Sequence, residues 1–579
     1  MKLHDVEPKA DPKKWEFVII VSLYASLITA VFTLPLIFQW RTHIPGFALS
    51  DGINHAWYAW WYQHALFDLG QSPAEISMIY HPYTYSHPLM VATPWARFLP
   101  SLVIYLGLPM QEMYNIHLFL SYVLTWVFMS LLCLELTKDQ QAAILGGAIF
   151  AFFPGKNMHT LSGHLTQILT YAYPLLILTL WRVWQQPTLK RGIWFGIALI
   201  LAATIDLMPL AYFAAPMTGM MLLYFLVTDR LRLLSPAMLK SLGIGCLLAA
   251  LVVIPLLLPL VRQSFQGNLS WYEAEGLEDF SADLISIILP PPGHPLSQSW
   301  QSLRNFSEDV YSYGASYTEA VVYAGWITLI FAILGVVKMR RQQRDIKLWV
   351  IVAFVASILA LGPTLRIAGQ IITIGADKTV TLPYYLFTKL PLLSWGRTPA
   401  RFNFTAVFAI AILATYGLAW LFSHVKRSAW RLTLMATLLL FVILDSKTNS
   451  PWPMLDLTIP DFYKQIMADQ EAGAVLDLPS DSYMADKYAM LYQTVHLRPI
   501  TAGRAYRIPP EVIEFREALA DAITKGDTEI LQQNNIAYVV LQRQFLTPDE
   551  LTRRQQQLSN LFGEPIYQDD WIVAFNTGF

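Results

Sequence analysis

A polar stretch rich in aromatic residues follows the first long apolar run and holds the strongest candidate for chemistry. It reads Ser-Asp-Gly-Ile-Asn-His-Ala-Trp over positions 50–57. The carboxylate of Asp51 could act as a general base that takes a proton from an acceptor hydroxyl group. His55 follows one helical turn later, where it could orient or tune that carboxylate. The simpler interpretation is that Asp51 only caps the start of a helix.

This stretch is predicted to form a helix over about 52–69. Ser50 or Asp51 would cap its start, and Gly70 would end it. Helical spacing separates the side chains into one face with Asp51, His55 and two tyrosines and another face with three tryptophans. Because Trp and Tyr collect at membrane–water interfaces, we expect the helix to lie on a membrane surface with its tryptophans as an interfacial belt. A platform for stacking a sugar is the alternative.

Two other segments offer cations that could hold a phosphate group. Lys156 and His164 lie in a short connection that also contains His159. Lys156 could extend to the membrane interface or meet a phosphate. Arg397 and Arg401 open a later apolar run. An arginine fork there could bind phosphate at a helix N-terminus, or could instead contact lipid headgroups.

Neither a metal nor another cofactor is predicted. His81 and His87 lie six residues apart in a proline-rich segment, but no third ligand follows at the spacing of a metal site. The two cysteines lie inside apolar runs, where they behave as small apolar residues. The formal net charge of −1 gives no basis for a nucleic-acid partner.

The composition places these residues in a membrane protein. Of the 579 residues, 55% are hydrophobic and 14% are charged, whereas soluble domains average about 25% charged residues. A spanning helix needs about 20 mostly apolar residues. About eleven such runs are predicted, at 15–38, 115–136, 140–154, 165–184, 192–207, 209–228, 239–262, 319–338, 347–363, 402–424 and 430–447. A further apolar stretch at 98–110 contains two prolines and is predicted to be re-entrant or interfacial.

Positively charged residues give the predicted orientation. Lys and Arg accumulate in short cytoplasmic loops. When the N-terminus is placed in the cytoplasm, every second connection of this chain is basic. The long connections 39–114, 263–318 and 364–401 then lie on the outer side of the cytoplasmic membrane.

The C-terminal part of the chain has a different pattern. Long apolar runs stop, and short β-like runs at 474–478, 536–541 and 571–575 alternate with helical patterns. The predicted fold is therefore a mainly α polytopic membrane domain at 1–448 followed by a small extracytoplasmic α/β domain at 449–579. We expect this second domain to be a docking or lid domain without chemistry of its own.

These features together resemble the GT-C superfamily of polytopic glycosyltransferases, which includes protein O-mannosyltransferases, aminoarabinose transferases and oligosaccharyltransferases. The resemblance rests on a cytoplasmic N-terminus, Asp51 early in a long first outer loop, and the surface helix that follows. It covers roughly 15–447, and the C-terminal outer domain is similar to that of many bacterial members. Some members carry paired acids in this loop, whereas Gly52 follows Asp51 here, which argues against a metal-dependent variant.

The resemblance implies transfer of a sugar from a polyprenyl-phosphate donor to a glycan, lipid or protein acceptor on the outer face of the membrane. Asp51 would be the general base of a direct displacement that inverts the anomeric carbon. The candidates for binding the donor phosphate or sugar are His55, Lys156, His164, Arg397 and Arg401.

Two other classes of protein remain as alternatives. A transporter or lipid flippase would place acids or unwound segments near the midplane of several helices, whereas the polar residues here gather in outer loops. A non-catalytic envelope-assembly protein with a GT-C-like fold would have much the same sequence. Solute transport that survives Asp51→Ala would indicate the first alternative, and cellular glycans that stay intact in Asp51→Asn would favour the second.

Overall fold

The chain folds into two compact units, each built from segments that are distant in sequence. The computed structural model describes residues 14–265, 277–312, 317–375, 378–389, 396–469, 473–480, 482–504 and 508–579. Unit 1 contains Met1–Phe38, Ile116–Leu161 and Leu165–Pro453, and unit 2 contains Gln39–Asn115, Ser162–His164 and Met454–Phe579. The predicted boundary after residue 448 falls near the last of these divisions, but unit 2 also takes in the first outer loop.

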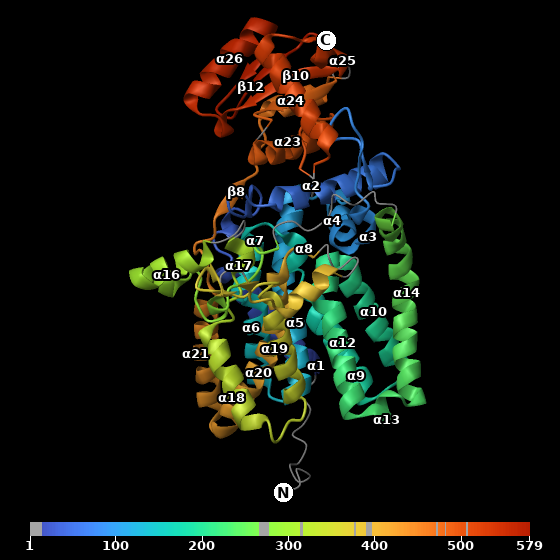
Figure 1. The fold of residues 1–579 in the computed structure, drawn as a ribbon, viewed down its shortest axis with the longest axis vertical. Coiled ribbons are helices and arrows are strands. Elements are labelled where there is room, and N and C mark those ends of the chain that lie inside the picture. The colour runs from blue at the N-terminus through green and yellow to red at the C-terminus, as the bar shows by residue number, and fades with distance from the viewer. Residues whose placement is uncertain are drawn as a thin grey trace. The chain divides into compact units, whose positions relative to one another are not determined.

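Unit 1 is a bundle of apolar helices (Figure 1). In chain order they are α1 (Lys14–Phe32), α5 (Met110–Thr137), α6 (Gln140–Phe152), α9 (Ala172–Gln185), α10 (Leu189–Ile205), α12 (Ala215–Thr228), α14 (Pro236–Phe265), α18 (Trp326–Met339), α19 (Ile346–Ala360), α20 (Asn403–His424) and α21 (Ser428–Ser446). Each of the eleven predicted apolar runs coincides with one of these helices.

Six helical stretches among the described residues are long and apolar enough to cross a membrane. They are Trp15–Phe32, Met110–Thr137, Leu207–Thr228, Pro236–Gln263, Pro399–His424 and Ser428–Ser446. Two shorter apolar helices, α18 and α19, fall below that length. The chain is therefore a multi-pass membrane protein, and the count of eleven spans stays a prediction.

Glycines let α18 and α20 approach each other closely. A Cβ atom added at Gly417 of α20 would lie 2.1 Å from the carbonyl oxygen of Phe331 in α18. One added at Gly335 of α18 would lie 2.2 Å from the carbonyl oxygen of Leu413 in α20. In lipid, where no hydrophobic effect draws helices together, such close backbone contacts hold a bundle through van der Waals packing.

The connections of unit 1 carry short elements. Among them are the helices α7 (Pro154–Leu161), α8 (Leu165–Ile168), α13 (Arg230–Leu233), α15 (Pro295–Ser299), α16 (Gln301–Tyr311), α17 (Tyr317–Ala320) and η8 (Pro399–Phe402). Two small antiparallel sheets precede η8, formed by β4 (Arg366–Ile367) with β5 (Gln370–Ile371) and by β6 (Thr373–Ile374) with β7 (Lys378–Thr379). Parts of the predicted outer loops, at 266–276, 313–316, 376–377 and 390–395, lie outside the described residues.

The C-terminal part of unit 2 is a four-stranded mixed sheet with helices packed against it (Figure 1). The strand order is β11-β12-β10-β9, in which β9 and β10 are parallel and the other pairs are antiparallel. The elements are α22 (Asp461–Met467), β9 (Ala474–Leu478), α23 (Tyr483–His496), α24 (Pro510–Lys525), α25 (Glu529–Gln533), β10 (Ile536–Gln542), α26 (Pro548–Phe562), β11 (Tyr567–Gln568) and β12 (Ile572–Asn576). Three of the strands coincide with the β-like runs predicted from the sequence. Leu476, Val539 and Phe575 from the sheet form a core with Leu519 and Leu558 from the helices.

The first outer loop belongs to the same compact unit as this sheet. Its strand β1 (His43–Pro45) pairs antiparallel with β8 (Met454–Asp456) at the start of the C-terminal segment. The Tyr80 N–H donates to the Ala502 carbonyl (3.1 Å), and the Ile500 N–H donates to the Met78 carbonyl (3.0 Å). These backbone hydrogen bonds join residues from the two ends of the chain into one fold.

The helix predicted after Asp51 is present. α2 (Gly52–Gln63) continues as a π-helical turn over His64–Asp68. Gly70, just beyond its end, has a φ of +64°, a left-handed conformation that glycine adopts without strain. The helix therefore ends where the sequence predicted.

The tryptophans of α2 are core residues, and the predicted interfacial belt is wrong for them. Trp57 and Trp61 are fully buried. The Trp57 Nε1–H donates to Oε1 of Gln493 (3.0 Å), and the Trp61 Nε1–H donates to the Pro73 carbonyl (2.9 Å). Because these indole groups find buried acceptors inside unit 2, their rings pack in its core.

Candidate functional site

Asp51 is the residue just before α2, at the N-cap position, but its carboxylate makes no capping hydrogen bond to the helix. The backbone N–H of Asp51 donates to the Ser162 carbonyl (2.8 Å), and the Gly52 N–H donates to the Ser50 hydroxyl (3.1 Å). The interpretation of Asp51 as a capping residue is therefore wrong. Its carboxylate can therefore accept hydrogen bonds from other side chains.

Three side chains surround the Asp51 carboxylate within unit 2. The Tyr483 hydroxyl donates to Oδ1 (2.6 Å), and the Lys487 ammonium donates to the same oxygen (2.8 Å). The His164 ring lies on the other oxygen, with Nε2 3.6 Å from Oδ2. The Asp51 side chain remains 32% exposed. Asp51 and His164, two of the site residues that the resemblance implied, therefore lie close together, and their roles stay a prediction.

Local structure places these groups. Ser482 caps α23 by accepting a hydrogen bond from the Ala485 N–H (3.3 Å). Tyr483 and Lys487 then follow at i and i+4, so they share one face of that helix. On the other side, Gly163 has a φ of +76°, and a Cβ atom there would lie 2.0 Å from the Gly52 nitrogen. The turn that carries His164 reaches Asp51 only because this residue is glycine.

The electrostatics of the cluster keep the carboxylate ionised. Burial alone would raise the pKa of Asp51, but the hydrogen bond from His164 and the charge of Lys487 outweigh it and hold the pKa far below its usual value. Burial lowers the pKa of Lys487 to about 8, against the opposing effect of Asp51. Burial and the Asp51 charge raise the pKa of Tyr483, so its hydroxyl stays protonated as a donor.

Arg504 adds a second cation to this cluster, and its charge is permanent. Its guanidinium carbon lies 4.1 Å from the centre of the Tyr483 ring, and the Lys487 nitrogen lies 3.7 Å from the ring centre. Cations are attracted to the face of an aromatic ring. One carboxylate and two cations thus meet around a single tyrosine, which gives the cluster an excess of positive charge.

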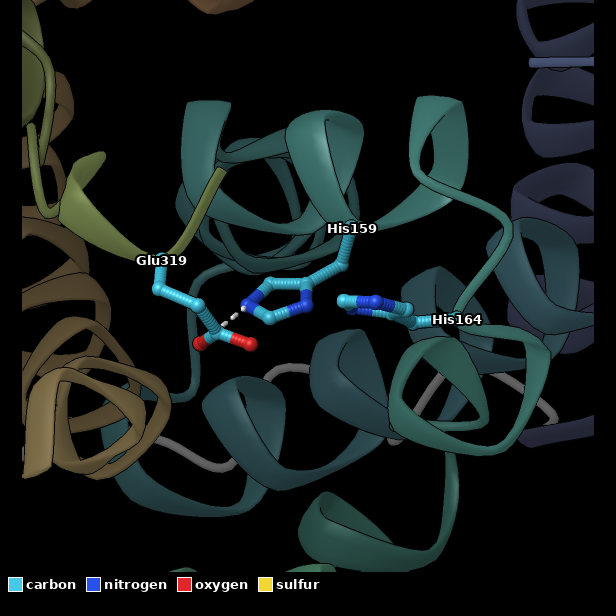
Figure 2. Close-up of side chains that lie close together, drawn as sticks. All are labelled: His159, His164 and Glu319. Atoms are coloured by element: carbon cyan, nitrogen blue, oxygen red, sulfur yellow. Dashed lines mark ion pairs between the residues drawn. The ribbon is translucent and has the colours of Figure 1, made fainter. Parts of the chain in front are cut away.

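A separate cluster of charged groups lies in unit 1. The Arg401 Nε–H lies 3.1 Å from both carboxylate oxygens of Glu319. His159 Nε2 lies 3.6 Å from Oε2 of the same carboxylate. Figure 2 shows the His159 ring directed toward Glu319, with the ion pair drawn as a dashed line. Arg401 therefore has a carboxylate partner, which offsets the charge that was expected to meet a phosphate.

The remaining predicted residues have different surroundings. Lys156 is fully buried, and its ammonium donates to the Ser121 carbonyl (3.3 Å) and the Thr125 hydroxyl (3.2 Å) of α5. The expectation that Lys156 extends to the membrane interface is wrong, because its partners lie inside the bundle. Arg397 in unit 1 lies with its guanidinium carbon 5.3 Å from the centre of the Phe280 ring.

His55 follows Asp51 along α2 as predicted. Its backbone N–H donates to the Asp51 carbonyl (3.1 Å), as the first turn of a helix requires. Two of the side chains around the Asp51 carboxylate, Tyr483 and Lys487, come from α23, far along the sequence. A role for His55 in binding the donor stays a prediction, and so does the convergence of Arg397 and Arg401 with Asp51.

Sequence reasoning missed Lys487, Tyr483 and Glu319. Lys487 and Tyr483 lie in the segment that was expected to have no chemistry of its own. The available signal was a lysine inside a helix whose other residues are mostly apolar or aromatic, since a buried lysine requires a partner. Glu319 begins one of the predicted apolar runs, and an acid there is a functional candidate in a membrane protein.

The fold is similar to that of solved GT-C glycosyltransferases. The archaeal oligosaccharyltransferase AglB from Archaeoglobus fulgidus, in complex with an inhibitory peptide and a dolichol-phosphate, matches with a TM-score of 0.51 and 13% identity, over 94% of this chain and 71% of that chain. The same oligosaccharyltransferase in complex with Zn and sulfate matches with a TM-score of 0.50 and 12% identity, over 94% and 69%. The arabinofuranosyltransferase AftD from Mycobacteria gives a TM-score of 0.57 and 14% identity, over 93% of this chain and 37% of that chain.

The family follows from a match in sequence. Residues 27–445 match the model of a family described as a domain of unknown function (DUF6311). Because the match covers most of the chain, the protein belongs to this family. No curated protein matches the chain in sequence.

Proposed function

We propose that the protein is a membrane glycosyltransferase that moves a sugar from a polyprenyl-phosphate donor to an acceptor on the outer face of the cytoplasmic membrane. The GT-C fold supports this class of reaction, since the solved structures that share it include an oligosaccharyltransferase bound to a dolichol-phosphate and an arabinofuranosyltransferase. The acceptor would be a glycan, a lipid or a protein.

The observation that carries the proposal is the partly exposed Asp51 carboxylate, which is held ionised by Lys487 and His164. An acceptor hydroxyl donates a hydrogen bond to this carboxylate while its oxygen attacks the anomeric carbon. The bond from that carbon to the phosphate oxygen breaks, and polyprenyl phosphate leaves with the electron pair. The acceptor proton ends on Asp51, and the anomeric carbon is inverted.

The low pKa of Asp51 determines when the proton moves. A carboxylate this acidic is a weak base, so it takes the proton late, once the attacking oxygen has begun to bond to the anomeric carbon and has become acidic. Its main contribution before that point is to orient the hydroxyl group and to stabilise the positive charge that develops on the sugar.

The leaving phosphate requires cations. We assign this role to His164, which lies beside Asp51 in unit 2, whereas a role for Arg397 stays a prediction. Arg401 is paired with Glu319, so we expect it to orient Glu319 and His159. Lys156 is excluded from the proposed donor site, because its ammonium is buried against α5.

A cellular experiment tests the proposal whichever sugar the donor carries. A strain that lacks the protein is complemented with the wild type, Asp51→Asn or Asp68→Asn, and its envelope glycans and glycolipids are analysed by mass spectrometry. Asp68 lies at the end of the same helical segment and is half exposed, so it provides a matched control.

The proposal predicts that one glycoform disappears in the deletion strain, returns with the wild type and Asp68→Asn, and stays absent with Asp51→Asn. An intact glycoform in Asp51→Asn would contradict the role of Asp51 and favour a non-catalytic assembly protein. Transport of a labelled polar solute that is lost on deletion and survives Asp51→Ala would favour a transporter.

A further inference from the structure

Lys487 is a buried cation that uses all of its hydrogen-bonding capacity on one short segment. Its side chain is 0% exposed. The ammonium donates to the Leu49 carbonyl (3.3 Å), the Ser50 carbonyl (2.7 Å) and Oδ1 of Asp51 (2.8 Å). An ammonium group has three N–H donors, so each acceptor takes one. A neutral amine has only two, so the observed contacts require the charged form.

Tyr483 supports the same carboxylate oxygen. One turn before Lys487 on α23, its hydroxyl donates to Oδ1 of Asp51 (2.6 Å), and its ring lies under the Lys487 ammonium. Both donors from α23 therefore converge on Oδ1. The second oxygen, Oδ2, faces His164 (3.6 Å), and in the proposed reaction this is the oxygen that accepts the proton from a substrate.

We propose that Lys487 is a positioning residue for Asp51, so that the C-terminal α/β segment completes the active centre of the transferase. Lys487 fixes the backbone at 49–51 and holds Oδ1, which leaves Oδ2 directed at the acceptor hydroxyl. This inference rests on the proposed function of Asp51. It replaces the expectation that the C-terminal segment has no chemistry of its own.

Stability alone gives a poor reason for this arrangement. Removing a lysine from water costs several kcal/mol, and an apolar residue of similar volume often stabilises a fold as well as a buried ion pair does. A charge at this position therefore serves the carboxylate that it contacts. Lys487 also donates to two carbonyl groups of the segment 49–51. Water could hydrogen-bond these carbonyl groups in its place, so the stability of this segment does not require a lysine.

Carboxyl labelling tests the contact without a substrate. The full-length protein in lipid nanodiscs is treated with a water-soluble carbodiimide and a small amine between pH 5 and pH 8, and modification of Asp51 is measured by mass spectrometry. Protonated carboxyl groups react preferentially, so the pH dependence of labelling reports the proton affinity of Asp51. The variants are Lys487→Met, Lys487→Arg and, as a matched control, Lys525→Met, which removes an exposed lysine paired with Asp521 on α24.

We expect Asp51 to stay unlabelled at pH 5 in the wild type, in Lys487→Arg and in Lys525→Met. In Lys487→Met, labelling at pH 5 should rise clearly above that of the wild type and should decrease again toward pH 8, because the loss of Lys487 raises the pKa of Asp51 while His164 still lowers it. Unchanged labelling of Asp51 in Lys487→Met would overturn the proposal. A rise that is independent of pH would also overturn it, because that result would indicate exposure of Asp51 without a change in its proton affinity.

The consumption of a polyprenyl-phosphate-linked sugar supplies the second readout. The turnover of the wild type should fall as the pH rises through about 8, the pKa of Lys487, whereas the turnover of Lys487→Arg should not, since arginine keeps its charge. The same alkaline decline in both proteins would overturn the proposal even if Lys487→Met fails to fold.

The two readouts separate this inference from the proposed function. In one outcome, labelling of Asp51 changes in Lys487→Met as expected while the protein consumes none of the donors supplied. That result would support the coupling of Lys487 to Asp51 and count against the transferase. Turnover that depends on Asp51 and is unaffected by Lys487→Met would support the transferase and overturn the role of Lys487.

Discussion

The Lys487 ammonium lies 2.8 Å from Oδ1 of Asp51, although 436 residues separate the two in the sequence. The contact belongs to a unit in which the first outer loop and the C-terminal segment share backbone hydrogen bonds and a two-stranded sheet. A carboxylate from the start of the chain and a cation from its end therefore form one cluster. A substitution of either residue should therefore change the surroundings of the other.

Gly163→Ala should disturb the Asp51 centre by displacing the turn that carries His164. A Cβ atom at this position would lie 2.0 Å from the Gly52 nitrogen, so the turn must move away from Asp51 and take His164 with it. A displacement of about 1 Å in a catalytic group can cost roughly 100-fold in rate. We expect donor consumption to fall by about that factor.

Gly107→Ala is the control for this effect. Gly107 also has a positive φ, of +93°, but a Cβ atom there has no neighbour within 4 Å. It should cost a similar backbone strain and leave donor consumption nearly unchanged. Equal losses of activity in the two variants would show that general strain, and not the approach of the turn to Asp51, limits the rate.

Glu319→Gln should destabilise unit 1 strongly. Glu319 and Arg401 are buried together, with 3% and 13% of their side chains exposed. Removing one partner of a buried ion pair leaves an uncompensated charge, at a cost of about 3–5 kcal/mol. Thermal unfolding in detergent should show a clear decrease in Tm, and the double variant Glu319→Gln/Arg401→Met should recover part of it.

The exposed pair of Arg304 and Glu308 on α16 provides the comparison. Both side chains are 48% exposed, and such surface pairs contribute about 0–1 kcal/mol. Glu308→Gln should therefore leave Tm nearly unchanged. A Glu319→Gln variant as stable as Glu308→Gln would contradict the buried ion pair.

Gly417→Ala should weaken the packing of α18 against α20. The added methyl group would lie 2.1 Å from the Phe331 carbonyl oxygen, so the helices must separate. Overpacking of this kind costs about 1–3 kcal/mol, and the unfolding temperature in detergent should fall. Gly219→Ala in α12 has open space around the new methyl group and should keep or raise Tm. Equal stability of the two variants would contradict the close contact.

Asp477 should make the stability of the C-terminal sheet depend on pH. Burial raises the pKa of this carboxyl group to about 7, against hydrogen bonds from Tyr463 and Gln542, and its Oδ2 has no hydrogen-bond partner among the described residues. The folded state then binds more protons than the unfolded state between about pH 4 and pH 7. Stability should fall as the pH rises through that window.

Hydrogen exchange of the β9 and β10 amides in the full-length protein measures this effect. Protection should decrease from pH 5 to pH 8 in the wild type, after correction for the intrinsic exchange rate. In Asp477→Asn the corrected protection should be nearly constant, whereas Asp521→Asn, at an exposed position of α24, should behave as the wild type does. A wild-type sheet whose protection is independent of pH would contradict a protonated Asp477.

Much of the secondary structure could be predicted because its signals are local. Apolar runs of the right length became helices, the short β-like runs became β9, β10 and β12, and the helix after Asp51 ends at Gly70 as its sequence indicates. The resemblance to GT-C enzymes singled out both Asp51 and His164, which the structure places 3.6 Å apart. Each of these predictions depends on residues close in sequence or on a shared fold.

The failures concern the partners of side chains, which depend on contacts distant in sequence. Trp57 looked like an interfacial residue because nothing near it reveals the Gln493 amide that accepts its N–H. Lys156 looked accessible because its acceptors lie on α5. No local pattern could pair Lys487 with Asp51, since the pairing depends on how the two ends of the chain meet.

The rate at which the purified protein consumes polyprenyl-phosphate-linked sugars tests the central claim most directly. Wild-type protein and Asp51→Asn are placed in lipid nanodiscs with a panel of such donors and an envelope extract as acceptor, and released polyprenyl phosphate is quantified. We expect the wild type to release it from at least one donor, and Asp51→Asn to be slower by roughly 100-fold or more, the usual contribution of general-base catalysis. Equal release by the two proteins would contradict the role assigned to Asp51, and no release from any donor would contradict the transferase.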